Sequence, residues 1–196
     1  MLDLKIKGGT IIDGSGAEGY SADVGVKDGL IVEIGSITQD ALETLDAEGA
    51  IVTPGFVDIH THYDGQITWD ETLSPSLYNG VTTCVMGNCG VGFAPVKKGE
   101  EERLVDLMEG VEDIPGTALS EGVKWGWTSF QDYMNALDLM PHSIDYLVQV
   151  PHDPVRMFVM GARAESNEQA TENDIAAMRD LVRQALEAGA AGFSTG

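Results

Sequence analysis

The chain has 196 residues, and its 11 Lys and Arg against 32 Asp and Glu give a formal net charge of −21. An acidic surface repels phosphate groups, which argues against nucleic acid and anionic membranes as partners. The hydrophobic share of 43% is ordinary for a globular protein, and no apolar run approaches the length of a membrane span. The first residues have no signal-peptide core and two cysteines cannot form a disulfide framework, so we expect a cytoplasmic protein.

The first fifty residues predict a small β layer. Leu2, Leu4 and Ile6 alternate with charged residues, which is the period of a half-buried strand. We expect Gly8-Gly9 to break that strand and Asp28-Gly29 to turn a hairpin between two apolar runs. A layer of this size cannot bury much surface alone.

From residue 54 onward, short apolar strands alternate with amphipathic helices, which predicts an α/β fold with a parallel sheet. The predicted strands cover residues 55–60, 81–86, 144–150 and 190–194. The predicted helices cover 72–78, 100–112, a segment opened by a Thr128/Gln131 capping box, and a long segment capped by Thr171 with Ile175, Met178, Leu181, Val182, Ala185 and Leu186 facing inward. We expect residues 113–127 to be irregular.

The sharpest chemical signal is His60-Thr61-His62, at the end of a predicted strand. Residues i and i+2 of a strand face the same side, so both imidazoles can point at one metal ion. Asp58 could hold one histidine in its ligating tautomer. The alternative is a pair of surface or packed histidines. Placement at the end of a strand favours the metal, because that end is the catalytic face of a parallel α/β barrel.

Two further strand ends carry candidate site residues. Cys89, in Gly-Asn-Cys-Gly after the second strand, is either a soft metal ligand or an ordinary loop cysteine. Cys84, inside that strand, is interpreted as a buried structural thiol. His152 follows the third strand and could line the same rim, although a backbone-bonded loop histidine is the favoured interpretation. Arg156 could bind a substrate carboxylate or pair with an acidic side chain.

These motifs together resemble a known family. Residues 54–62 resemble the first barrel strand of the amidohydrolase superfamily, with its Pro-Gly, Asp and His-x-His. Residues 80–90, with Gly-Asn-Cys-Gly, are similar to the N-acyl-D-amino-acid deacylase (D-aminoacylase) branch, as are the weaker segments 125–137, 150–161 and 189–196. The resemblance implies that His60, His62 and Cys89 are metal ligands, the cysteine replacing a carboxylated lysine of other branches.

The resemblance also implies a (β/α)₈, TIM-like barrel, which needs about 250 residues. Residues 54–196 would supply about its first four βα units, and residues 1–53 the N-terminal part of a small β-sandwich domain. The remaining histidine ligands and the aspartate general base would then lie beyond residue 196. We therefore expect an N-terminal part, completed by a further C-terminal half or by association with a second copy.

The implied function is zinc-dependent hydrolysis of linear amides, with one or two Zn²⁺ ions. The small-molecule substrate would be an N-acyl-D-amino acid, cleaved to a D-amino acid and a carboxylate. One alternative is a cyclic amidase of the dihydroorotase or hydantoinase type, but that type needs a lysine after the fourth strand, and residues 190–196 contain none. Another is a non-catalytic chain that associates through its open half-barrel.

Overall fold

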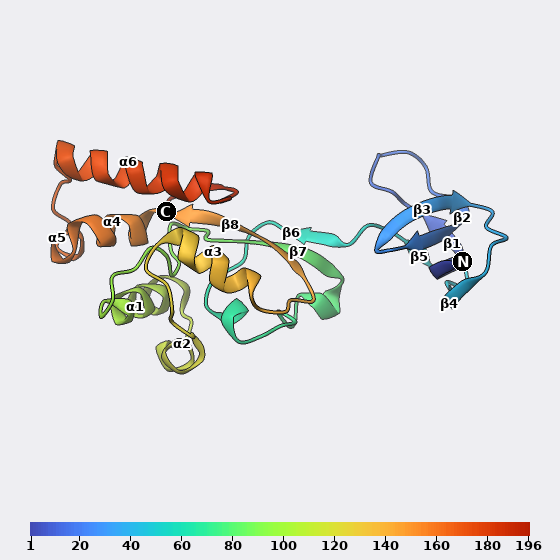
Figure 1. Ribbon diagram of the computed structural model, residues 1–196, viewed down its shortest axis with the longest axis horizontal. Coiled ribbons are helices and arrows are strands. Elements are labelled where there is room, and N and C mark those ends of the chain that lie inside the picture. The colour runs from blue at the N-terminus through green and yellow to red at the C-terminus, as the bar shows by residue number, and fades with distance from the viewer. The chain divides into compact units, whose positions relative to one another are not determined.

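The computed structural model describes residues 1–196, which form two compact units, Met1–Gly55 and Phe56–Gly196. The first unit is a five-stranded sheet of order β3-β2-β1-β4, with β5 also paired to β1 (Figure 1). Its strands are β1 (Leu2–Ile11), β2 (Tyr20–Lys27), β3 (Leu30–Gly35), β4 (Ala41–Asp46) and β5 (Ile51–Val52). The β2–β3 hairpin predicted at Asp28-Gly29 is confirmed.

The expected break at Gly8-Gly9 is wrong, because β1 runs through both glycines. Its pairing with β2 shifts register between Ile6 and Gly9, and Gly8 has a φ of 68°. A glycine in this left-handed region lets a strand absorb an irregularity and resume its pairing. The two glycines therefore bend the strand without ending it.

The second unit is a parallel sheet whose four strands lie in chain order, β6-β7-β8-β9 (Figure 1). The strands are β6 (Phe56–Asp58), β7 (Val81–Met86), β8 (Asp145–Pro151) and β9 (Gly192–Ser194). The helices are α1 (Glu101–Glu112), α2 (Gly116–Gly122), α3 (Phe130–Asp138), α4 (His152–Met160), α5 (Ala162–Glu165) and α6 (Glu172–Glu187). The α/β fold with a parallel sheet is confirmed. No helix is both long and apolar enough to cross a membrane.

The two faces of this sheet differ in burial. Met86 and Val148 are paired across β7 and β8 and lie in the core, together with apolar residues of α1, α3, α4 and α6. Leu147, on the opposite face, is 47% exposed, and Val57 is 55% exposed. One face is therefore covered by helices, and the other carries exposed apolar side chains.

Several helix predictions need correction. The predicted helix 72–78 does not form: residues 72–76 are turns, and the 3-10 turn η2 (Leu77–Asn79) follows. The Asp70 carboxylate accepts hydrogen bonds from Thr72 and Ser74, and these bonds compete with helical bonding. Residues 113–127, predicted irregular, contain α2, which starts directly after Pro115, a residue tolerated at a helix start.

Local sequence patterns located two helix caps to within one residue. The capping box of α3 uses Ser129 and Asp132 in place of Thr128 and Gln131, one residue later than predicted. Thr171 caps α6 as predicted, with Asp174 as its reciprocal partner. Within α6, Ala185 is buried, but Ile175 is 54% and Leu186 47% exposed, so their inward placement was wrong. The sequence analysis also missed α4 and α5.

Candidate metal centre

Two strand ends bring His60, His62 and Cys89 together. β6 ends at Asp58, so both histidines lie just beyond the strand, and Cys89 lies in the loop after β7. The two imidazole rings have centroids 5.4 Å apart, and His60 Nε2 lies 3.2 Å from Cys89 Sγ. One ligand atom from each residue lies within 4.8 Å of the others. This spacing suits three donors that share one ion.

Thr61 explains why the two histidines point the same way. Its backbone N–H and its Oγ1 both donate to the Val85 carbonyl, at 2.9 and 2.8 Å. Thr61 is therefore buried against β7, and the imidazoles on either side of it lie next to each other. Asp58 Oδ1 accepts a hydrogen bond from the His60 backbone N–H at 3.2 Å. The carboxylate thus fixes the main chain at His60, where the sequence suggested a contact with an imidazole.

Asn88 joins the histidine segment to the cysteine loop. Its Nδ2 donates to the carbonyls of Thr61 and Val85, at 3.0 and 2.9 Å, and its Oδ1 accepts from Gln149 Nε2 at 2.7 Å. Asn88 is buried, so these contacts satisfy the amide without water. The residue beside Cys89 therefore joins the segment after β6 to β7 and β8 at the site.

The cysteine loop is also held from β9. Ser194 Oγ accepts from the Gly90 N–H at 3.1 Å and donates to the Gly87 carbonyl. Gly87 has a φ of 77°, and a Cβ there would clash with the Gln149 carbonyl. Cys89 itself has a φ of 53°, an uncommon conformation for a side-chain-bearing residue. The loop geometry that presents Cys89 thus depends on Gly87 and Ser194.

Glu112, which sequence analysis missed, reaches this cluster from the last residue of α1. Its Oε2 lies 3.3 Å from His62 Nε2, and the two side chains are 21% and 16% exposed. Burial lowers the pKa of His62, partly opposed by the Glu112 charge. Burial also raises the pKa of the Cys89 thiol, and Glu112 adds to that rise. No local signal marked Glu112, because its position depends on how α1 returns to the sheet.

Asp64 is a second residue that the sequence analysis missed. It is 1% exposed, and burial raises the pKa of its carboxyl group to about 7. The Gly87 backbone N–H donates to this carboxyl group, which links Asp64 to the cysteine loop. Asp64 Oδ2 and the nearby His62 Nδ1 are buried without a hydrogen-bond partner.

The structure does not bring His152 into the metal-binding cluster. His152 begins α4 directly after β8. Its Nδ1 lies 3.4 Å from Thr195 Oγ1 and 3.7 Å from Asp153 Oδ1, and its ring lies near Phe193. The histidine sits at the carboxyl end of the sheet, facing β9.

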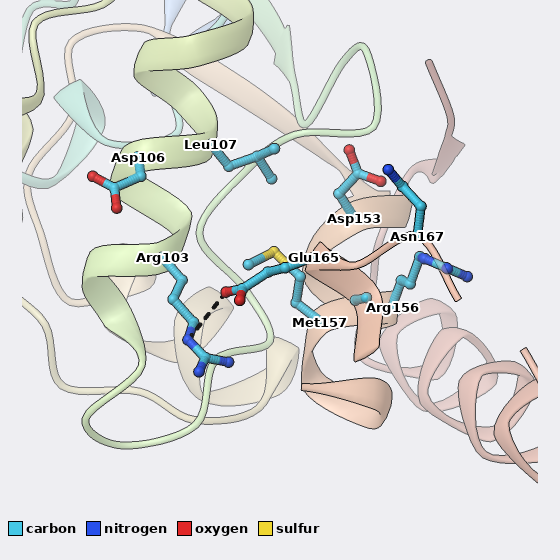
Figure 2. Close-up of a pocket in the computed structure, with 9 residues that line it drawn as sticks. Arg103, Asp106, Leu107, Asp153, Arg156, Met157, Glu165 and Asn167 are labelled. Carbon is cyan, nitrogen blue, oxygen red and sulfur yellow. Dashed lines mark ion pairs between the residues drawn. The ribbon is translucent and has the colours of Figure 1, made fainter. Parts of the chain in front are cut away.

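Arg156 lines a pocket of about 480 Å³ between α1, α4 and α5, and its guanidinium extends away from α1 (Figure 2). Its Nη2 donates to the Glu168 carbonyl. An Arg103–Glu165 ion pair of 3.2 Å crosses the same pocket. Asp153, also in the lining, donates its backbone N–H to the Gly90 carbonyl at 2.9 Å, so the pocket wall is tied to the cysteine loop.

Residues 43–196 match the family model described as amidohydrolase family. The chain belongs to the amidohydrolase family. Among curated relatives, a D-aminoacylase of Alcaligenes xylosoxydans xylosoxydans is 37% identical over all of this chain, which covers 38% of that protein. An N-acyl-D-aspartate deacylase from the same organism is 34% identical over all of this chain, which covers 37% of it.

Solved structures agree with this assignment to the amidohydrolases. A D-aminoacylase, described in a study of its binuclear metal centre, superposes with a TM-score of 0.84 and 35% identity, covering 100% of this chain and 39% of that one. An N-acyl-D-glutamate deacylase from Bordetella bronchiseptica, complexed with zinc and a phosphonate inhibitor, gives a TM-score of 0.77 and 36% identity, covering 100% and 38%. The chain therefore spans well under half the length of the relatives it matches.

Proposed function

We propose that this chain carries part of the active site of a zinc hydrolase that deacylates N-acyl-D-amino acids. The observation that carries the proposal is the His60–His62–Cys89 cluster at the carboxyl ends of two parallel strands. The relatives named D-aminoacylase and N-acyl-D-aspartate deacylase, similar over the whole chain, support this substrate class. Because those relatives are much longer, we propose that further ligands and the general base lie outside residues 1–196.

The donor set fits zinc. Imidazole nitrogen and thiolate sulfur are zinc's usual protein ligands, with bonds of about 2.0–2.3 Å. Two nitrogens and one sulfur lie within 4.8 Å of one another, close enough for small adjustments to bring them onto one ion. Thiolate also favours zinc over magnesium or calcium, which prefer oxygen ligands. We propose one or two zinc ions in the complete site.

When bound, zinc acts as a Lewis acid that polarises the amide carbonyl and makes water a better nucleophile at neutral pH. The chain's own residues prepare the place where this happens. Thr61, bonded to Val85, holds the segment that carries both imidazoles against β7. Asn88 fixes the distance between the histidine segment and the cysteine loop, and Ser194 holds that loop against β9. Such supporting contacts set how tightly a site binds its metal.

We further propose that the β6–β9 sheet is part of a (β/α)₈ barrel and that the β1–β5 sheet is part of a small β-sandwich. The parallel strands follow chain order, with α-helices between β7 and β8 and between β8 and β9, as a barrel of this kind requires. On β3, the side chains of Leu30, Ile31, Val32 and Ile34 are all exposed. An apolar strand of this kind is suited to packing against a second layer.

The test compares zinc binding with turnover. We expect the 196-residue chain to bind zinc, and His60→Ala and Cys89→Ala to weaken that binding. A complete polypeptide that includes this chain should release D-methionine from N-acetyl-D-methionine, and Cys89→Ala should abolish release. Faster hydrolysis of the L-enantiomer or of a cyclic amide would contradict the substrate class. Turnover that survives Cys89→Ala unchanged would contradict the metal centre.

A further inference from the structure

Glu112 brings a negative charge to the metal centre without belonging to its donor set. The donor atoms that lie within 4.8 Å of one another come from His60, His62 and Cys89. Glu112 Oε2 lies 3.3 Å from His62 Nε2, and the Glu112 side chain is only 21% exposed. A zinc ion held by the three donors has the Cys89 thiolate and, in the complete site that we propose, further ligands to balance its charge. The Glu112 carboxylate is therefore available to a substrate.

The protein supplies no permanent cation to Glu112. Its one ion-pair partner is His62, an imidazole that must be neutral to bind a metal ion. Glu112 is also the last residue of α1, and the final turn of that helix contains no basic residue. The C-terminus of a helix carries partial negative charge, which adds to the charge of the carboxylate. A carboxylate largely removed from water is stabilised by a cation, so a positively charged ligand group is favoured at this position.

Charge also determines which half of a substrate faces Glu112. Every N-acyl-D-amino acid has a carboxylate on its amino-acid half, and Glu112 and the C-terminus of α1 both repel that group. The amino-acid half therefore points away from the end of α1, and the acyl half lies beside it. Because Glu112 lies 3.3 Å from a metal ligand, the acyl group that it meets is close to the carbonyl that is cleaved. An amino group on the carbon next to that carbonyl fits this position.

We propose that Glu112 binds the ammonium group of an aminoacyl substituent, so that the preferred substrates are dipeptides with a free amino terminus and a C-terminal D-residue. The proposal rests on the proposed deacylase function and names its acyl group. Hydrolysis consumes one water molecule, breaks the bond between the acyl carbon and the amide nitrogen, and releases one amino acid and one D-amino acid. The ammonium group takes no part in this step. Its hydrogen bond to Glu112 is charge-assisted, which makes it stronger than a bond between neutral groups.

The experiment compares two substrates of a complete polypeptide that includes this chain. Glycyl-D-methionine and N-propionyl-D-methionine have acyl groups of the same shape, and only the glycyl group is charged. At about pH 7 its amino group is mostly protonated. We expect kcat/KM to be at least about tenfold higher for the glycyl compound, mainly through a lower KM. Titration calorimetry of the metal-free polypeptide, which measures binding without turnover, should give the same order of affinity.

Two variants test whether this preference comes from Glu112. Glu112→Gln keeps the shape of the side chain and removes its charge, and it should lower the glycyl-to-propionyl ratio of kcat/KM by at least about tenfold. Glu109→Gln, at an exposed position one turn earlier on α1, removes the same charge and should leave the ratio unchanged. Because each ratio compares two substrates on one protein, a partial loss of folded or metal-loaded protein cancels.

Equal kcat/KM values for the two compounds in the wild type would refute this inference and leave the proposed function intact. A glycyl preference that persists unchanged in Glu112→Gln would refute it too. A wild-type polypeptide that hydrolyses neither of these compounds nor N-acetyl-D-methionine would refute the proposed function as well.

Discussion

Gln149 determines which way the amide of Asn88 faces. Gln149 Nε2 donates to Asn88 Oδ1 at 2.7 Å, so Asn88 Nδ2 is left to donate to the carbonyls of Thr61 and Val85. One buried amide thus joins the segment that carries the histidines to the loop that carries the cysteine. The spacing of the metal donors depends on this orientation.

Asn88→Asp should disrupt the site, because a carboxylate would face two carbonyl oxygens with no donor. Leaving buried polar groups unpaired costs about 1–3 kcal/mol, and we expect that loss in urea unfolding of the metal-free chain. Zinc affinity should fall by about tenfold or more. Asn135→Asp, at an exposed position on α3, is the matched control. Equal zinc affinity in Asn88→Asp and the control would show that Asn88 does not set the donor spacing.

Ser194→Ala should loosen the cysteine loop from the side of β9. The change removes the acceptor for the Gly90 N–H and the donor to the Gly87 carbonyl. We expect faster reaction of Cys89 with a thiol reagent in the metal-free chain and weaker zinc binding. Cys84 is buried and should react slowly in both proteins. Ser120→Ala, exposed on α2, is the control, and equal Cys89 reaction rates in the two variants would argue against the role of Ser194.

The sequence predicted the parts of this site that depend on strand order. His60, His62 and Cys89 each follow a strand of a parallel sheet, and parallel strands end at one edge, so their proximity follows from local patterns. Glu112 and Asp64 were not predictable in this way. Glu112 reaches the cluster only because α1 packs back against the sheet, and Asp64 is buried by contacts distant in sequence, such as Tyr133, whose hydroxyl donates to the Asp64 carbonyl.

Helix predictions failed where side chains compete with the backbone. The Asp70 carboxylate accepts hydrogen bonds from the backbone N–H groups of Thr72 and Ser74 and so stabilises a turn. The spacing of apolar residues gives no sign of this turn. The Pro115-Gly116 pair is typical of a segment that interrupts a helix, but here it lies at the start of α2. By contrast, the capping pattern at Thr171 located α6 correctly, because a capping box is satisfied by residues three apart in the chain.

Thr171→Ala tests that cap. The Thr171 side chain accepts the Asp174 N–H, and Asp174 accepts the Thr171 N–H in return. Removing the hydroxyl should lower the free energy of unfolding by about 1 kcal/mol. Thr171→Ser keeps the acceptor and should restore most of the loss. A Thr171→Ala chain with wild-type stability would mean that the Arg163–Asp174 ion pair of 2.9 Å holds the helix start without the cap.

Asp64→Asn should change how stability depends on pH. Burial raises the pKa of Asp64 from 3.8 to about 7, so between these values the folded chain keeps a proton that the unfolded chain releases. The stabilising contribution is therefore complete below about pH 4, falls as pH rises to about 7, and stays constant above. At about 1.4 kcal/mol per pKa unit, the full shift corresponds to roughly 4 kcal/mol. Asparagine resembles the protonated acid and does not ionise, so the Asp64→Asn variant should gain stability over the wild type across this window.

The measurement is urea unfolding at about pH 4.5 and about pH 7.5, two values that span most of this window. Both proteins are unfolded in the presence of a chelator, and the exposed Asp106→Asn is the control. A gap between variant and wild type that does not widen with pH would show that Asp64 ionises normally in the folded chain.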